Sequence, residues 1–197
     1  MHTKVGIIKI KMIMVILILF PILISAQHLK LGLDAELSYI RIISTKGNKS
    51  MGLSYDETFS PVTFNLIIGY NLNKNLTFQT HIGKTLIAVE FSGFEFGLNG
   101  IYHYNKKFYA SAGVLQHSNE GSGSNSYGVS YASLFMLTAG IGYYTSKYFA
   151  LELNFYYPTK RKEIIGYNTL YYSEGFNPRW NFYYMLRLGF VFALENR

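Results

Sequence analysis

The sequence predicts an all-β chain in which eight antiparallel strands, joined in up-and-down order, close into a transmembrane β-barrel behind a cleavable signal peptide. Three observations predict this: an apolar segment near the N-terminus, a two-residue periodicity in eight later segments, and a turn sequence that occurs three times. Composition agrees, because aromatic residues make up 17% of the 197 residues and charged residues only 15%, against roughly a quarter in soluble domains. The chain contains no cysteine, which excludes a disulfide framework.

The N-terminal segment has the three parts of a secretory signal peptide. Residues 1–11 carry three lysines and no acid, residues 12–24 contain no polar side chain, and Ser25 and Ala26 follow. A membrane-spanning helix needs about 20 apolar residues, so this shorter run favours cleavage after about Ala26 over a retained anchor. We therefore expect a signal peptide at 1–26 and a barrel domain at 27–197. Loss of the leader lysines lowers the formal net charge from +7 to +4, which removes the main argument for nucleic-acid binding.

Eight segments of about ten residues alternate between apolar side chains and small or polar ones. They are 29–39, 62–70, 76–83, 94–104, 108–115, 134–143, 149–157 and 182–192. On the apolar parity, 39 of the 41 positions are Ala, Val, Ile, Leu, Phe or Tyr, and none is charged. Because a soluble β-sandwich presents a charged face to water, we expect this charge-free face to contact lipid. Backbone groups in lipid must pair internally, which requires the strands to close into a barrel.

The opposite parity of these segments is rich in glycine and polar side chains, which suits the narrow interior of an eight-stranded barrel. Its charged members are Lys30, Asp34, Glu36, Glu95, Glu152 and Arg187. We expect them to form a lumen charge network, either a static plug of ion pairs or a gate for ions. The plug is favoured, because side chains fill a barrel of this size. We expect Arg187, the only arginine of the set, to pair with Glu36 or Glu152.

A similar turn sequence occurs in 67–78, 100–111 and 141–153: a tyrosine, a short turn with asparagine or lysine, and then an aromatic residue or leucine. A chain that crosses a membrane repeatedly meets the same interface each time, so we expect three tight periplasmic turns, at 71–75, 105–107 and 145–147. Four longer outer connections are expected at 44–58, 84–93, 116–130 and 158–180. An aromatic girdle at the periplasmic interface is predicted from Tyr70, Tyr102, Tyr104, Phe108, Tyr143 and Phe149.

The last predicted strand contains a motif. The sequence RLGFVFAL at 187–194 fits a polar-x-Gly-x-x-aromatic-x-hydrophobic pattern, with Arg187, Gly189, Phe192 and Leu194 at the four defined positions. This pattern resembles the C-terminal signal that closes outer-membrane barrels, although here the residues ENR follow it. Together with the leader and the eight strands, the mature chain resembles the family of small outer-membrane β-barrels that includes the membrane domain of outer-membrane protein A.

The resemblance implies a porin-like integral protein of a Gram-negative outer membrane, non-enzymatic, with a structural or adhesive role or as a narrow pore. The implied partners are outer-membrane lipids and lipopolysaccharide, with periplasmic chaperones and the barrel-insertion machinery during assembly, and we expect a monomer that binds no nucleic acid. No cofactor or metal is expected, because His81 and His103 are isolated and no zinc or phosphate-binding motif occurs. The basic residues at 160–162 fit a solvated loop better than a lipopolysaccharide contact.

The sequence LQHSNEG at 115–121 leaves a lipid-modifying enzyme as the alternative. It resembles the His-x-Ser-Asn region of outer-membrane lipid A deacylases, eight-stranded barrels that use histidine, serine and an acid. The candidate catalytic residues are His117, Ser118 and Glu120. Here the histidine and serine are adjacent, and adjacent residues of a strand point to opposite faces, so we favour a polar loop edge over a catalytic site.

The closing motif generates a prediction about assembly. Phe192→Ser or Gly189→Asp should reduce insertion into the outer membrane more than Lys160→Gln or Lys162→Gln, because only the first pair alters the motif. The amount of folded protein in isolated membranes, measured from heat-modifiable migration on gels, checks this. Equal amounts for the strand and loop variants would remove the support for the motif.

Overall fold

The computed structural model describes residues 28–44, 56–86, 91–120, 129–159, 163–167 and 179–195. The predicted signal peptide at 1–26 lies outside these residues. No helix in the described ranges is long and apolar enough to cross a membrane. The strands found there are β1 (Leu29–Ser44), β2 (Asp56–Phe59), β3 (Val62–Asn71), β4 (Leu76–Leu86), β5 (Gly93–His103), β6 (Phe108–Asn119), β7 (Val129–Tyr131), β8 (Leu134–Tyr144), β9 (Phe149–Pro158), β10 (Glu163–Tyr167) and β11 (Arg179–Glu195).

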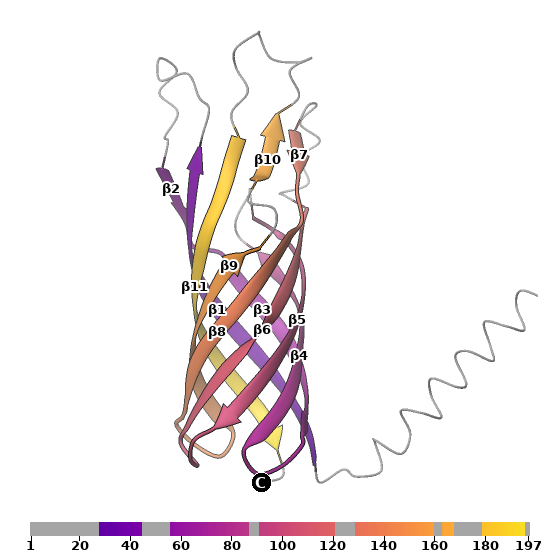
Figure 1. Cartoon of the computed structure of the whole chain (residues 1–197), viewed down its shortest axis with the longest axis vertical. Coiled ribbons are helices and arrows are strands. Elements are labelled where there is room, and N and C mark those ends of the chain that lie inside the picture. The colour runs from indigo at the N-terminus through magenta and orange to yellow at the C-terminus, as the bar shows by residue number, and fades with distance from the viewer. Residues whose placement is uncertain are drawn as a thin grey trace, which may run out of the picture.

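Eight of these strands form a closed antiparallel barrel (Figure 1). Neighbours around the wall follow the order β1, β3, β4, β5, β6, β8, β9 and β11, and β11 then pairs with β1. This closing pair runs from Lys30 opposite Glu195 to Ser44 opposite Trp180. Each segment predicted from the alternation maps onto one barrel strand, so the eight-stranded architecture is confirmed.

The alternation of side chains sets the two surfaces of the wall. In β9, Ala150, Glu152 and Asn154 are buried in the lumen, whereas Leu151 and Leu153 are 38% and 48% exposed on the outside. Leucine, isoleucine, phenylalanine and tyrosine side chains are exposed in the same way on all eight barrel strands. Water would destabilise such a continuous apolar band, and the hydrocarbon core of a bilayer accommodates it.

The three tight turns share one hydrogen-bonding pattern, which explains the repeated sequence. In each turn, a side-chain oxygen accepts hydrogen bonds from the backbone N–H groups two and three residues further on, at 2.8 to 3.2 Å. The accepting residues are Asn73, Asn105 and Ser146. The chain therefore reverses direction over the residues 72–75, 104–107 and 145–148. All three turns lie at the same end of the barrel, which we call the turn end (Figure 1).

The opposite end, which we call the outer end, contains strands that the sequence does not predict. β2 pairs with the last residues of β1, β10 pairs with β11, and β7 pairs with β10. These three strands stand above the rim, beside the upward continuations of β1 and β11 (Figure 1). They have only three to five residues each, which is too short for a recognisable alternation. The residues expected to form outer connections therefore include β-structure.

A β-bulge in β11 contradicts one predicted orientation. Arg41 lies opposite Tyr184 and Ile42 opposite Phe182, so Tyr183 is an extra residue between two ladder positions. Phe182 consequently faces the lumen and is fully buried, and Tyr183 is 38% exposed. An unbroken alternation over 182–192, counted in steps of two from Arg187 on the lumen face, predicts the reverse: Tyr183 in the lumen and Phe182 on the lipid face. An inserted residue reverses the parity on one side of it, and an unbroken alternation cannot register this.

Two apolar clusters fill the lumen at different levels. The turn-side cluster consists of Ile67, Ile101, Tyr109, Tyr144, Ala150, Val191 and Ala193. The outer-side cluster consists of Ile40, Phe91, Leu115, Leu134, Met136, Tyr156, Phe182 and Met185. Charged side chains that include Glu36, Glu95 and Arg187 lie between them, so the barrel interior is packed in three main layers, with Thr77 and His103 as further buried polar side chains near the turns.

The packing of Tyr109 on Gly142 generates a prediction about stability. These residues lie opposite each other on β6 and β8, and a Cβ atom at position 142 would overlap the Tyr109 ring. Gly142→Ala should therefore displace the ring and cost about 1–3 kcal/mol of the free energy of unfolding, seen as a lower midpoint of heat-modifiable migration in detergent. Gly100→Ala is the control, because its Cβ would meet no atom nearer than 3.8 Å. Equal midpoints for the two variants would contradict the packing.

Candidate functional site

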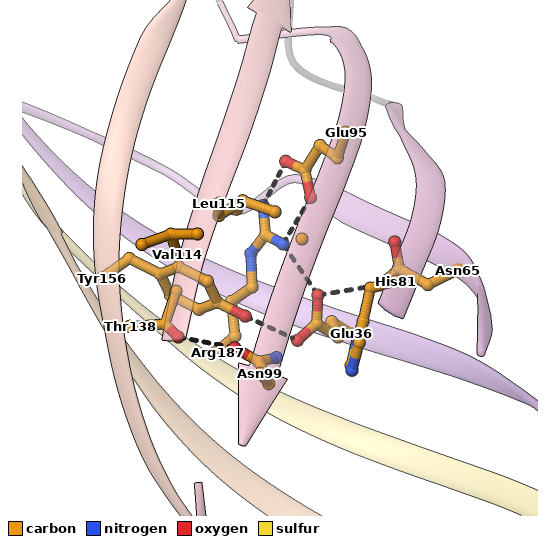
Figure 2. A pocket seen from close by; sticks show the side chains of 11 residues that line it. Glu36, Asn65, His81, Glu95, Asn99, Val114, Leu115, Thr138, Tyr156 and Arg187 are labelled. Carbon is orange, nitrogen blue, oxygen red and sulfur yellow. Dashed lines mark hydrogen bonds and ion pairs between the residues drawn. The ribbon is translucent and has the colours of Figure 1, made fainter. Parts of the chain in front are cut away.

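Arg187 lies in the barrel lumen, with its guanidinium group between the carboxylates of Glu36 and Glu95 (Figure 2). Its side chain is 1% exposed. Nη1 donates hydrogen bonds to Oε2 of Glu36 and to Oε2 of Glu95, both at 2.7 Å, and Nη2 donates to Oε1 of Glu95 at 2.6 Å. Glu95 is therefore bound through both carboxylate oxygens, the geometry for which the guanidinium group is suited.

The other edges of the guanidinium group are also covered. Nε contacts the sulfur of Met185 at 3.2 Å, and the guanidinium carbon lies 4.8 Å from the centre of the Tyr156 ring. The Tyr156 hydroxyl donates a hydrogen bond to Oε1 of Glu36 at 3.1 Å. Tyr156 therefore covers the cation and binds one of its anionic partners, which reduces the cost of burying both charges.

Glu95 extends the network toward the outer end. Its Oε1 accepts a hydrogen bond from the Thr85 hydroxyl at 2.7 Å and lies 2.8 Å from Nδ1 of His117. The His117 ring stacks on Phe91, with ring centres 3.9 Å apart and planes 1° from parallel. The charged layer is thus joined directly to the outer-side cluster.

Uncharged side chains also donate hydrogen bonds to the acids of the lumen. Nδ2 of Asn65 donates to Asp34 at 3.2 Å and to Glu36 at 3.1 Å. Glu152 accepts hydrogen bonds from the Tyr109 hydroxyl at 2.5 Å and from Nδ2 of Asn154 at 3.1 Å. Tyr109 belongs to the turn-side cluster, so the charged layer also makes direct contact with the apolar layer below it.

All six predicted lumen charges are buried, at 4% exposure or less: Lys30, Asp34, Glu36, Glu95, Glu152 and Arg187. Arg187 meets Glu36, one of its two predicted partners, and the structure shows no hydrogen bond from Arg187 to Glu152. It also meets Glu95, which the sequence did not assign to it. β5, which carries Glu95, stands opposite β11 in the ring of strands. Contacts across the lumen depend on barrel diameter and strand stagger, which alternation alone does not determine.

Little free space remains in the lumen cavity beside Arg187. The cavity beside Arg187 is lined by residues that include Glu36, Asn99 and Thr138, and its volume is about 10 Å³. This is at the lower limit for a single water molecule. A chain of water or a hydrated ion therefore has no room in this cavity.

The two predicted lumen histidines lie in different surroundings. Nδ1 of His81 is 4.0 Å from Oδ2 of Asp34, and its Nε2 contacts the Gln79 amide. Nε2 of His103 is 3.1 Å from the Thr77 hydroxyl, and its ring lies 5.7 Å from that of Tyr109. Within the described ranges, no three His, Asp or Glu side chains are grouped as metal ligands.

The alternative catalytic residues are not brought together. His117 is fully buried against Glu95. Ser118 lies opposite Phe94, whose ring is 46% exposed on the outer surface. Glu120 is exposed and lies 3.5 Å from Lys84. The basic residues at 160–162 are outside the described part of the chain.

The predicted girdle residues lie at the turn end, and several of their rings are in contact. Phe108 and Tyr143 have ring centres 5.0 Å apart, and Phe149 and Phe192 have centres 5.1 Å apart. The closing-motif residues Phe192 and Leu194 are 37% and 56% exposed on the outside, whereas Arg187 and Gly189 face the lumen. The girdle as predicted comprised Tyr70, Tyr102, Tyr104, Phe108, Tyr143 and Phe149, without Phe192.

The buried ion pairs generate a prediction about stability. Arg187→Met should cost about 3–5 kcal/mol of the free energy of unfolding, because it leaves Glu36 and Glu95 buried without their cation. Lys84→Met is the matched control: it breaks the Lys84–Glu120 pair, in which both side chains are 56% exposed, and should cost less than about 1 kcal/mol. Urea unfolding in lipid vesicles measures both values. Similar costs for the two variants would contradict the central position of Arg187.

No protein-family model and no curated protein sequence matches the chain. Among solved structures, it is similar to the N-terminal β-barrel domain of Pseudomonas aeruginosa OprF, with 19% identity over 82% of this chain and 97% of that one, and a TM-score of 0.41. It is also similar to Neisserial surface protein A, with 16% identity over 82% and 96% and a TM-score of 0.43. The attachment invasion locus protein of Yersinia pestis has 13% identity over 84% and 99%, and a TM-score of 0.43. By its own strand order and closure, this chain has the architecture of the small eight-stranded outer-membrane β-barrels.

Proposed function

We propose that this chain is a non-enzymatic integral protein of a Gram-negative outer membrane, in which a non-conducting barrel anchors the β-structure at its outer end. The observation that carries the proposal is the lumen, which is occupied by an apolar, a charged and a second apolar layer. We favour this structural or adhesive role over a narrow pore.

Placement in a membrane is supported by the outer wall of the barrel. Outward side chains such as Leu33, Phe64 and Ile141 are 61%, 54% and 63% exposed. The closed ring of strands leaves no unpaired edge within the wall, as lipid requires. Export through the predicted signal peptide, with cleavage after about Ala26, belongs to the same proposal, as do a monomeric state and contact with outer-membrane lipids and lipopolysaccharide.

A static lumen is supported by the hydrogen bonds and ion pairs of Arg187, several of which would have to break at once to open a path through the barrel. Opening a path past Arg187 would separate it from two carboxylates and expose each of these to an incompletely hydrated environment. The apolar layers on either side would still exclude ions, because hydrophobic constrictions resist wetting. Three connected layers in series therefore favour a plug over a gate.

A role at the outer end is supported by the length of the closing strands. β1 and β11 have 16 and 17 residues, whereas the other six barrel strands have 10 to 12. The additional length continues the wall beyond the rim and pairs with β2 and β10 (Figure 1). Such an extension is suited to presenting a surface outside the membrane.

Planar-bilayer recording tests the proposal. The mature protein, folded in detergent as judged by heat-modifiable migration, should insert and give no channel steps above the baseline. Arg187→Met should also give none, because the two apolar layers remain in place. Discrete, reproducible conductance steps from the unaltered barrel would overturn the non-conducting role. A mature protein that is soluble and monomeric without detergent would overturn the membrane placement.

A further inference from the structure

We propose that the turn end of the barrel binds anionic phospholipid headgroups in the periplasmic leaflet through Lys74, Lys106, Lys107 and Lys147, which we call the turn-end lysines. This inference rests on the membrane placement in the proposed function. It assigns the tight turns a ligand, a phospholipid with a net negative headgroup, in addition to their part in reversing the chain.

The charge of the turns is of one sign. The residues 72–75, 104–107 and 145–148 include four lysines and no aspartate or glutamate, and all four lysines are exposed. Within the described part of the chain, none of them forms an ion pair with an acid. The three turns lie side by side at one end of the molecule (Figure 1), so their positive charges add.

At the third turn, the lysine lies against an apolar surface of three rings. Nζ of Lys147 is 5.4 Å from the centre of the Tyr148 ring. The Tyr148 ring is 6.4 Å from that of Phe192, which is 5.1 Å from that of Phe149. These rings are 44%, 37% and 53% exposed on the outside of the barrel. Aromatic rings are stable at the depth of the glycerol and headgroup region, which puts the ammonium group at the depth of the phosphates.

The second turn repeats the arrangement with two lysines. Lys106 and Lys107 lie in a turn flanked by the ring pair of Tyr102 and Tyr104, with centres 5.2 Å apart, and by that of Phe108 and Tyr143, with centres 5.0 Å apart. Tyr104 is 68% exposed. The first turn is a simpler version, in which Lys74 follows Leu72, which is 48% exposed.

The length of the turns selects a lipid over a partner in the aqueous space. Each turn has only four residues between strand ends, so its lysine cannot extend far beyond the aromatic rings. A lysine stem lies along apolar surface while its ammonium group reaches toward charge, which suits a phosphate at the interface. The lysines come from separate turns and do not converge on one cavity, so each faces its own headgroup.

Native mass spectrometry of the full mature protein tests the proposal. The protein is folded in detergent with equal amounts of dioleoyl-phosphatidylglycerol and dioleoyl-phosphatidylcholine, and the bound lipids are counted. The unaltered protein should retain the anionic lipid at least about fivefold over the zwitterionic one, the preference expected from a single lysine near an anionic surface. The variant with Lys106→Gln, Lys107→Gln and Lys147→Gln keeps only Lys74, so its excess of bound anionic lipid should fall to about a quarter of that of the unaltered protein.

A second triple variant, with Lys160→Gln, Arg161→Gln and Lys162→Gln, is the matched control, because it removes the same charge from another part of the chain. It should keep the preference. The inference would be overturned if the unaltered protein showed no preference for the anionic lipid, or if both triple variants lost the preference equally. It would also be overturned if inorganic phosphate, added at fixed ionic strength, competed the anionic lipid away. The inference would also be overturned if the turn-end lysines proved necessary for binding to isolated peptidoglycan but not for the ratio of the two bound lipids. None of these results would contradict the proposed function, provided that the barrel still folds in phosphatidylcholine, because membrane placement does not require an anionic lipid.

Discussion

The ion pairs of Arg187 are the interaction on which the rest of the lumen depends. One guanidinium group binds carboxylates from β1, its neighbour in the wall, and from β5, on the opposite side of the barrel. The charged layer therefore links two opposite walls across the diameter that the number and stagger of the strands set. The surroundings are arranged to make the burial tolerable, with a tyrosine ring over the cation and hydroxyl and amide donors on the acids. Apolar side chains could fill the same space without needing specific partners. The buried charges therefore contribute more to selecting one arrangement of the lumen than to the free energy of unfolding.

Glycine is the counterpart of this crowded interior. A Cβ atom at Gly140 would overlap the side-chain oxygen of Asn154, and one at Gly142 would overlap the ring of Tyr109. Both glycines lie on β8, beside strands that carry large lumen side chains. Glycine is thus frequent at the lumen-facing positions of the sequence because a strand without a side chain there leaves room for a large side chain of its neighbour.

The sequence predicts the wall of the barrel well and the contacts across its lumen poorly, for physical reasons. A two-residue period is a property of each strand alone, so eight strands and the orientation of Glu36 and Arg187 could be read directly. The partnership of Arg187 with Glu95 requires the diameter and stagger of the closed ring, which no single segment contains. Phe182 was assigned to lipid because a bulge has no signal in a short alternating pattern. The acceptors Asn73, Asn105 and Ser146 could have been found, since residues of their kind at the second position of a tight turn have a known chemistry.

The shared geometry of the three tight turns has a consequence for the order in which the barrel forms. The hairpins β3–β4, β5–β6 and β8–β9 each join residues close in sequence, through a reversal that side chains within the turn stabilise. Such pairs close small loops and lose little chain entropy. The pairing of β1 with β11 joins residues far apart in the sequence, from Lys30 to Glu195. Arg187 can reach both Glu36 and Glu95 only when those strands are in place. On entropic grounds we therefore expect the local hairpins to pair first, and the seam and its buried ion pairs to form together as the last, cooperative step.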